Sequence, residues 1–308
     1  MTQSVSCGEA LISLLESYDV DTVFGIPGVH TLDLYRGLAH SKIRHVQARN
    51  EQGAGFMADG YARLGGKPGV CVLISGPGVT NACTPMGQSF ADSIPVLMIS
   101  STTASYSLGK GWGCLHEVTD LEAVTRPLTA LSATASSPDD LEELIGQAFS
   151  IFASERPRPV HIAIPIDVLA QPVSTTWQRR VVPAPPAPAG SAIREAAALL
   201  RQARRPLIYA GGGAVNAAPT LTEIAERLDA AVITTTAGKG VVPDSHPLFV
   251  GGGIVRPQAR AFLAQADVIL AIGTEMSETD SFVERLTLNG QLIRVDIDSR
   301  KLNDLYPA

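Results

Sequence analysis

Short apolar runs alternate with stretches of helical periodicity along the first half of the chain. The runs contain few polar residues, which is typical of strands buried on both faces of a parallel sheet. A helix is expected at the start, because Ser6 and Glu9 have the spacing of a capping box ahead of an apolar stripe. The predicted strands are residues 21–25, 43–47, 70–75, 96–100 and 160–164.

The same alternation resumes after a proline-rich segment, residues 181–190. Proline lacks a backbone N–H, so such a segment favours an extended spacer over a helix or an inner strand. We therefore predict an α/β protein with two parallel-sheet domains, residues 1–170 and 191–308, joined by a linker at 171–190. The later strands are expected at residues 206–210, 231–235, 268–272 and 292–295.

Composition agrees with two domains and narrows the list of partners. The chain has 308 residues, 45% of them hydrophobic and 18% charged, and a net charge of −6. This charge gives no electrostatic reason to bind nucleic acid or an anionic membrane. No apolar run approaches the ~18 residues of a membrane span, and the N-terminus has no signal-peptide core. We expect a cytoplasmic protein that binds neither nucleic acid nor a membrane.

The cysteines favour neither a zinc site nor a disulfide framework. There are four of them, widely spaced and without a C-x-x-C pair. Buried free thiols in a reducing compartment are the expectation.

Glycine-rich turns mark the places where a parallel sheet can hold a ligand. The first, Gly25–Gly28, combines a proline and a flexible residue between a strand and a helix. In the second, Ser75–Asn81, two glycines let a flat ligand approach the backbone. Both turns also have a purely structural interpretation, in which Thr80 and Asn81 cap the next helix.

A carboxylate opens the helix predicted from the segment Arg49–Arg63. Glu51 stands in its first turn, among small and apolar residues that would desolvate it. An acid in this position interacts favourably with the helix dipole, which is its structural interpretation. In the functional interpretation, a buried acid exchanges a proton with a ring nitrogen of a bound heterocycle. The spacing alone does not decide between the two.

Taken together, these motifs resemble a known family. The turns, the segment Asn50–Arg63 and Ala91–Pro95 are similar to the pyrimidine-binding domain of thiamine diphosphate enzymes of the acetolactate synthase type. The second half resembles the Rossmann-like middle domain of that family, which holds FAD in some members. The segments that carry this second likeness are Ala210–Gly213, Thr236–Gly240, Ala266–Gly273 and Val295–Asp298.

Within the family, Gly25–Gly37 and Leu108–Glu117 resemble bacterial 2-ketoarginine (5-guanidino-2-oxopentanoate) decarboxylases more than acetolactate synthases. Acetolactate synthases usually have Phe-Gln where this chain has Leu115 and His116. The resemblance implies non-oxidative decarboxylation of a 2-oxo acid. The alternatives are a carboligase that joins pyruvate, as acetolactate synthase does, and a non-catalytic fragment that dimerises or binds a nucleotide.

The resemblance also implies roles for particular residues. Glu51 would bond the aminopyrimidine ring, so that the cofactor forms its C2 ylid, attacks the 2-oxo acid, loses carbon dioxide and releases an aldehyde through an enamine. His116 would protonate the enamine or orient the substrate, or make only a structural hydrogen bond. Glu117 would pair with a guanidinium tail. Further cofactor contacts are expected from Pro27, Gly28, Gly76, Pro77, Gly78 and Asn81.

Some parts of the family's active site are not found in the sequence. The family holds Mg²⁺ and the diphosphate on a third domain with a Gly-Asp-Gly motif and an asparagine pair, and this chain contains neither. We therefore expect an incomplete second domain, an absent C-terminal diphosphate-binding domain, and no activity from this chain alone. A homodimer or tetramer is implied. FAD remains open, since Gly211, Gly212 and Gly213 suit nucleotide binding or a plain turn.

Overall fold

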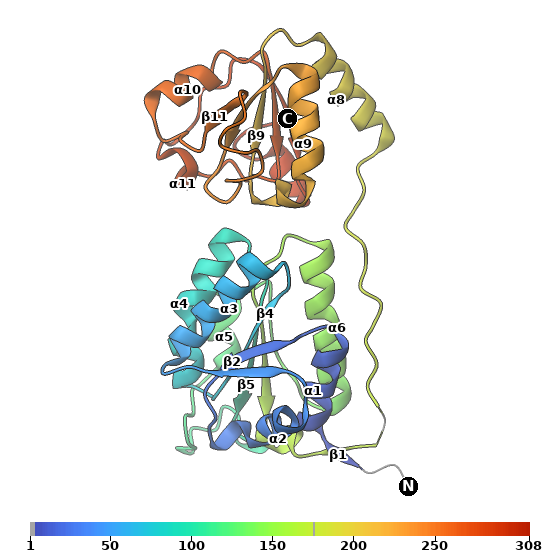
Figure 1. The fold of residues 1–308 in the computed structure, drawn as a ribbon. Helices are drawn as coiled ribbons and strands as arrows, with labels where there is room; N and C mark the ends of the chain where they lie inside the picture. The colour runs from blue at the N-terminus through green and yellow to red at the C-terminus, as the bar shows by residue number, and fades with distance from the viewer. Residues whose placement is uncertain (1–3, 175) are drawn as a thin grey trace. The chain divides into compact units, whose positions relative to one another are not determined.

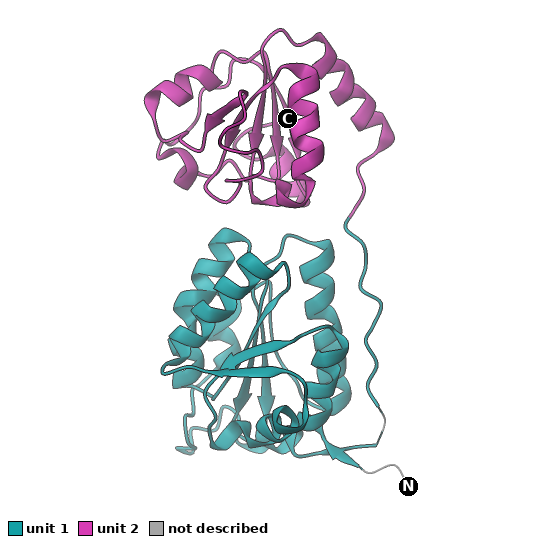
Figure 2. Cartoon of the chain, in the orientation of Figure 1, with its two compact units in different colours: residues 1–185 teal, residues 186–308 magenta. Residues whose placement is uncertain are grey.

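The computed structural model describes residues 4–174 and 176–308, which divide into two compact units at Pro185 and Pro186 (Figures 1 and 2). The boundary falls inside the segment that we predicted as the linker. Strand β8 (Pro172–Val173) pairs with β1 (Val5–Ser6), and Trp177 is buried in the core of the first unit. Residues soon after 171 therefore belong to that unit, and the extended connection is shorter than predicted.

The first unit is built on a six-stranded parallel sheet with the order β3-β2-β4-β5-β7-β6. The five strands that we predicted in this half are all present. The sixth, β6 (Leu131–Thr134), was missed because its half-buried, partly polar residues form no apolar run. The predicted strands are β2 (Thr22–Gly25), β3 (Arg44–Gln47), β4 (Gly69–Leu73), β5 (Val96–Thr102) and β7 (Val160–Pro165).

Helices cover both faces of this sheet, which explains the continuous apolar runs. Alternate strand residues point to opposite faces. Val70 and Val72 therefore join one core, while Cys71 and Leu73 join the other. The first core is covered by α1 (Cys7–Ser17), α2 (Leu32–His40) and α6 (Pro138–Ser154), and the second by α3 (Glu51–Gly65), α4 (Pro77–Asp92) and α5 (Leu121–Thr125).

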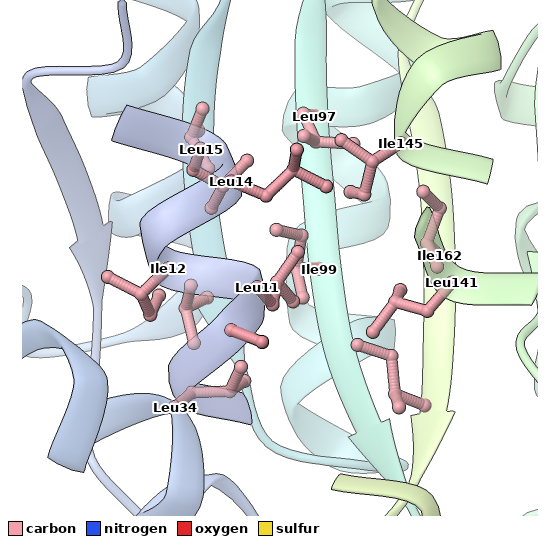
Figure 3. Packing of buried hydrophobic residues seen from close by; sticks show 14 of the residues in the cluster. Leu11, Ile12, Leu14, Leu15, Leu34, Leu97, Ile99, Leu141, Ile145 and Ile162 are labelled. Carbon is pink, nitrogen blue, oxygen red and sulfur yellow. The ribbon is translucent and has the colours of Figure 1, made fainter. Parts of the chain in front are cut away.

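Helix α1 begins as the sequence predicted. The Ser6 side chain accepts a hydrogen bond from the Glu9 amide, and the Glu9 carboxylate accepts one from the Ser6 amide at 2.9 Å. The apolar stripe then places Leu11 and Leu15 against the sheet, where they contact the same core as Ile99 (Figure 3). Burial of each such side chain contributes about 1.5–3 kcal/mol to folding. Short elements complete the unit: η1 (Val29–Thr31), η2 (Ser105–Ser107), η3 (Arg126–Leu128) and α7 (Ile166–Leu169).

The second unit has a five-stranded parallel sheet with the order β11-β10-β9-β12-β13. Its four predicted strands are present, and β11 (Phe249–Gly251) is additional. The prediction of two α/β domains with parallel sheets is confirmed. The other elements are α8 (Gly190–Gln202), β9 (Pro206–Ala210), η4 (Gly212–Ala217), α9 (Ala218–Leu228), β10 (Ala231–Thr234), α10 (Pro257–Leu263), β12 (Val268–Ile272), α11 (Glu278–Ser281), β13 (Gln291–Val295) and η5 (Ser299–Asn303).

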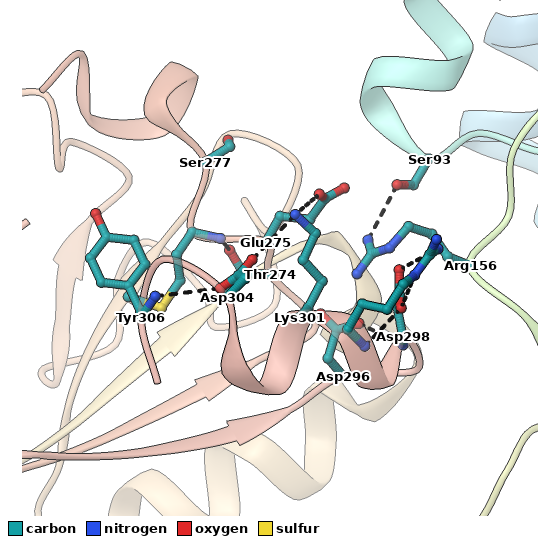
Figure 4. Close-up of polar contacts among 12 residues, drawn as sticks. Ser93, Arg156, Thr274, Glu275, Ser277, Asp296, Asp298, Lys301, Asp304 and Tyr306 are labelled. Atoms are coloured by element: carbon teal, nitrogen blue, oxygen red, sulfur yellow. Dashed lines mark hydrogen bonds and ion pairs between the residues drawn. The ribbon is translucent and has the colours of Figure 1, made fainter. Parts of the chain in front are cut away.

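The residues after β13 fold back onto the second unit. The Arg294 guanidinium, whose side chain is 1% exposed, donates to the Asp304 carboxylate at 2.7 Å. Lys301 pairs with both Asp304 and Glu275 (Figure 4). The buried Tyr306 hydroxyl accepts the Leu286 amide at 2.7 Å. A buried arginine requires such a partner, so these contacts anchor the segment that follows the last strand.

Two further sequence expectations can be compared with the described residues. All four cysteines are free, but only Cys7 and Cys71 are buried, whereas Cys83 and Cys114 are half-buried. Among the helices in this part of the chain, none is long and apolar enough to cross a membrane.

Candidate functional site

The strand order of the first unit changes direction between β2 and β4, and we call the region at the carboxyl ends of these two strands the crevice. The chain runs from β2 outward to β3 and then returns across β2 to β4, so the connections leave these two strands in opposite directions. Open α/β sheets hold their ligands at such a point. The turn Gly25–Gly28 follows β2, and Ser75–Gly78 follows β4. The two glycine-rich turns that we predicted to form a site are therefore neighbours in space.

The glycines of these turns are required by close contacts. Gly76 has φ +53°, and a Cβ atom there would lie 2.2 Å from the carbonyl oxygen of His116. At Gly28 and Gly78, a Cβ would lie 2.7 Å from side-chain atoms of Ile74. The turn after β4 therefore accepts the His116 loop on one side and places the Ile74 side chain between Gly28 and Gly78.

Pro27 and Pro77 shape the entrances to the two turns. Pro27 is exposed between β2 and η1, while Pro77 occupies the first turn of α4, where its fixed φ suits a helix start. Thr80 and Asn81 lie inside α4 and do not cap it, since the N-cap position is Gly76. The capping interpretation of these two residues is therefore wrong, and the Asn81 side chain is available for another contact.

That contact joins Asn81 to Glu51. Helix α3 begins at Glu51, with Asn50 as its N-cap, and the Asn81 amide donates to Glu51 Oε2 at 2.9 Å. A Cβ at position 78 would lie 3.6 Å from Glu51 Cγ, so the carboxylate stands directly beside the turn after β4. Glu51 is half-buried in this chain, whereas the sequence predicted a desolvated acid.

His116 reaches the same crevice from the loop that follows β5. Its backbone has φ +56°, which is uncommon outside glycine. The Ser75 hydroxyl donates to the His116 carbonyl at 3.4 Å, which ties the loop to the turn after β4. The His116 Nδ1 atom is buried without a hydrogen-bond partner. The structure thus brings Glu51 and His116 to opposite sides of one turn.

Glu117, which follows His116, is turned toward its own loop. Its carboxylate accepts backbone N–H groups of Gly111, Gly113 and Cys114 at 2.7–2.9 Å. Gly109, Gly111 and Gly113 all have positive φ, so the loop wraps around the carboxylate as an anion-binding nest. The Cys114 amide and then those of the glycines hold the Glu117 pKa below its usual range. A guanidinium partner would have to share this carboxylate with the loop.

His30 was not singled out from the sequence, although it directly follows the predicted turn. It is buried in η1, 7% exposed, and its ring lies edge-on to that of His116 with centroids 6.2 Å apart. A single histidine after a turn carries no periodic signal, so its burial depends on the contacts that the loop after β5 supplies. Ile74 was also not singled out, because its contacts with Gly28 and Gly78 depend on the packing of the two turns.

The glycine loop of the second unit is closed rather than open. Gly211 and Gly213 donate their amides to the carbonyls of Ile272 and Gly273 at 2.9 and 3.0 Å. A Cβ at Gly211 would lie 2.2 Å from the Gly273 oxygen. Two of the three amides expected to meet a phosphate are thus used within the unit. This geometry favours the plain-turn interpretation of Gly211, Gly212 and Gly213.

Comparison with known proteins assigns both units to one family. Residues 5–123 match the model of the thiamine pyrophosphate enzyme N-terminal TPP binding domain, and residues 193–308 match the thiamine pyrophosphate enzyme central domain. The chain belongs to the thiamine pyrophosphate enzyme family; thiamine pyrophosphate is another name for thiamine diphosphate. The crevice of the first unit lies in the domain that this family uses to bind the cofactor.

Individual relatives narrow the comparison. The chain is 57% identical over 308 residues to the probable 2-ketoarginine decarboxylase AruI of Pseudomonas aeruginosa. The alignment covers 99% of this chain and 55% of that protein. It is 36% identical to an acetolactate synthase of Mycobacterium bovis and 35% identical to the large subunit of acetolactate synthase isozyme 1 of Escherichia coli. These matches cover 97% and 96% of this chain. The chain spans about half the length of these curated relatives.

Proposed function

We propose that this chain supplies the pyrimidine-binding half of the active site of a thiamine diphosphate-dependent decarboxylase of 2-oxo acids. The likeness to the probable 2-ketoarginine decarboxylase supports a substrate with a cationic guanidinium tail. Leu115 and His116 stand in the loop beside the crevice, where acetolactate synthases usually have Phe-Gln, and this difference favours decarboxylation over carboligation. The whole reaction needs groups beyond the two units described above.

One observation carries the proposal. Glu51 stands at the N-terminus of α3, oriented by Asn81, beside a turn whose glycines let the His116 loop and the Ile74 side chain pack closely. A carboxylate in this position can hold a proton against a ring nitrogen of an aminopyrimidine. The buried, unpartnered Nδ1 of His116 on the other side of the turn is a second polar group that a ligand would satisfy. The residues of the crevice therefore fit the cofactor's pyrimidine ring.

Each residue of the crevice has a separate role in the proposed reaction. Bound thiamine diphosphate supplies a nucleophilic carbon and accepts the electron pair that carbon dioxide leaves behind. Glu51 moves a proton at the pyrimidine nitrogen, and Asn81 orients its carboxylate. Gly76 lets the His116 loop approach the turn after β4, and Ile74, packed against Gly28 and Gly78, provides an apolar contact. His116 stands where it can donate a proton to the product carbon, and Glu117 holds the loop that carries it.

The resemblance places the diphosphate and Mg²⁺ on a third domain of the family. Among the described residues, no group of three or more His, Cys, Asp or Glu side chains could hold a metal ion. We therefore propose that Mg²⁺ and the diphosphate are held by residues outside this chain. FAD is not assigned to the loop Gly211–Gly213, whose amides are used internally.

We also propose that the site is completed in a homodimer or a higher oligomer. Large apolar side chains are exposed on the loops that carry the two histidines. Trp112 is 65% exposed, and the others are Val29, Leu32, Tyr106 and Leu115. Exposed apolar surface around a ligand site marks a place that another protein surface covers. A second copy of the chain is the partner that these loops would meet.

The experiment compares two variants of the full-length gene product. Glu51→Gln should lower the rate at which the C2 proton of bound thiamine diphosphate exchanges with deuterium by about 10²–10⁴-fold. Release of carbon dioxide from 2-ketoarginine should fall with it, because the amide cannot exchange a proton. The control is Glu143→Gln, an exposed acid on α6, which should change neither rate.

Three outcomes would contradict parts of the proposal. Wild-type exchange in Glu51→Gln would remove the role of Glu51. Acetolactate as the main product from pyruvate would favour the carboligase. A Glu117→Gln variant with an unchanged preference for 2-ketoarginine over 2-ketoisovalerate would show that Glu117 does not bind the guanidinium group.

A further inference from the structure

The 3₁₀ turn after β2 places a histidine in the candidate site that has no role in the function proposed above. His30 is 7% exposed, and its Nδ1 atom is buried without a hydrogen-bond partner in the described chain. An unpartnered buried nitrogen costs folding free energy, because water no longer solvates it. In native proteins such a group calls for an explanation, and a role in catalysis is one of them.

His116 repeats this situation from the opposite wall. It too has a buried Nδ1 atom without a partner, and its backbone is held at φ +56°. Because Gly76 has no side chain, the His116 carbonyl oxygen can lie 2.2 Å from the position that a Cβ atom would occupy there. The loop is thus held in a strained conformation that brings this ring against the turn after β4.

The two rings face each other. Their centroids are 6.2 Å apart at an interplanar angle of 81°, so one ring presents its edge to the face of the other. The hydroxyl of Ser101, on the strand β5 that packs against η1, is a third buried polar atom without a hydrogen-bond partner in the described residues. In the described residues, three of the six unpartnered buried side-chain atoms therefore belong to β5, the loop after it, or η1.

The charged side chains near the two histidines are engaged in other contacts or lie across the turn. On α2, which packs against η1, Asp33 is paired with Arg36 at 2.6 Å. Strand β5 carries no titratable side chain. Glu117 accepts the amides of its own loop, and Glu51 lies across the turn Ser75–Gly78. Burial, and then the charge of His116, lower the pKa of His30.

We propose that His30 is a second acid–base side chain of this site and forms an imidazole pair with His116. The proposal rests on the proposed function. When carbon dioxide leaves a 2-oxo acid, the electron pair of the broken carbon–carbon bond stays with the former carbonyl carbon. An N–H bond of the pair breaks, a C–H bond forms, and the neutral ring recovers its proton from water. One proton is consumed for each aldehyde released, as the overall reaction requires.

Two imidazoles serve this step better than one. A proton on either ring disfavours a proton on the other, because like charges at this distance repel. The pair therefore resists binding a second proton, so one ring keeps a free acceptor nitrogen. The charged ring can donate to carbon while the neutral ring accepts a hydrogen bond from the substrate or returns the proton.

The first experiment needs no cofactor. The chain is labelled with ¹⁵N-histidine and titrated by NMR as wild type, His116→Asn and His40→Asn. We expect the pKa of His30 to rise by roughly half a unit or more in His116→Asn, because the neighbouring charge is removed. His40 is exposed at the end of α2, and its replacement should leave the His30 titration unchanged. An identical His30 titration in wild type and His116→Asn would overturn the pairing.

The second experiment separates protonation from the earlier steps. In the full-length gene product, His30→Asn should lower aldehyde formation about 10²–10⁴-fold. Ferricyanide takes two electrons from the same carbon before it is protonated, and with water yields the carboxylic acid. Carbon dioxide release with ferricyanide should therefore stay near the wild-type rate. An equal loss of both products would assign His30 to substrate binding or folding and overturn the proposal.

The outcomes distinguish this proposal from the proposed function. A wild-type protein that decarboxylates no 2-oxo acid would overturn the function, while the NMR coupling would still report whether the pair exists. If His30→Asn does not fold, as judged by its thermal unfolding, His30→Gln provides the same test with a longer amide side chain.

Discussion

At the scale of single residues, a fully buried histidine lies away from the site. His161, on β7, is fully buried, and its two ring nitrogens are hydrogen-bonded to the hydroxyls of Ser100 at 2.8 Å and Thr125 at 2.7 Å. Thr125 also bonds Ser132 at 2.7 Å. Burial lowers the pKa of His161 to about 3. The ring is therefore neutral at physiological pH and joins α5 to the sheet.

The buried His161 predicts how the free energy of unfolding depends on pH. A histidine in an unfolded chain titrates near pH ~6.5. On acidification His161 therefore binds a proton in the unfolded chain but stays neutral in the folded one. The free energy of unfolding should be unaffected above about pH 6.5 and should fall by about 1.4 kcal/mol per pH unit below it, down to the folded pKa of about 3. His161→Gln should lack this contribution. Urea unfolding of both proteins at several pH values measures the difference.

The matched control for this prediction is His40→Gln, since His40 is exposed and should retain the wild-type slope. Parallel pH profiles for wild type and His161→Gln would show that the buried histidine does not set the acid sensitivity. The comparison between variants is needed because carboxylates also contribute to acid unfolding.

At the scale of elements, the packing of α3 on α4 decides where Glu51 and Asn81 lie. Gly55 of α3 faces Pro85, which lies inside α4, and a Cβ at Gly55 would be 2.4 Å from Pro85 Cγ. Such an approach allows the two helices to pack closely. Gly60, on the same helix, has open space where its Cβ would be.

The two glycines give a matched pair of variants. Gly55→Ala should lower the free energy of unfolding by about 1–3 kcal/mol, because the added methyl group forces the helices apart. Gly60→Ala should raise it by about 0.5–1 kcal/mol, because alanine loses less backbone entropy in a helix. Urea unfolding at neutral pH measures both. Equal effects of the two substitutions would contradict the close helix contact.

Elements also differ in how far the sequence reveals them. Strands buried on both faces, such as β4 and β12, were predicted because every residue in them is apolar or small. Strands β6 and β11 were missed because their half-buried residues form no such run, and pairing with β7 and β10 is what makes them strands. Edge strands depend on a neighbour, which local periodicity does not report.

At the scale of the whole molecule, the two units have separate cores and meet in sequence at an exposed, proline-rich segment. We expect the fragments 1–185 and 186–308, expressed separately, each to unfold cooperatively, because each buries its own apolar residues. Their summed circular dichroism spectra should equal that of the intact chain. A fragment that stays unfolded alone but folds when mixed with the other would contradict this independence.

The sequence by itself determined the two-domain α/β architecture and the chemistry-bearing motifs. Both follow from local information: the apolar period of each strand, the capping box at Ser6, and glycine where no side chain fits. Glu51 was predicted in the first turn of a helix, and the structure places it there.

Only the tertiary structure decided which groups share the crevice. Strand order brings the turn after β2, the turn after β4 and the loop after β5 together, so that His30 meets His116 and Asn81 meets Glu51. The same long-range packing turns Glu117 toward its own loop and closes Gly213 against Gly273. These contacts join residues far apart in the chain, and their distances depend on how sheets and helices pack rather than on any local pattern.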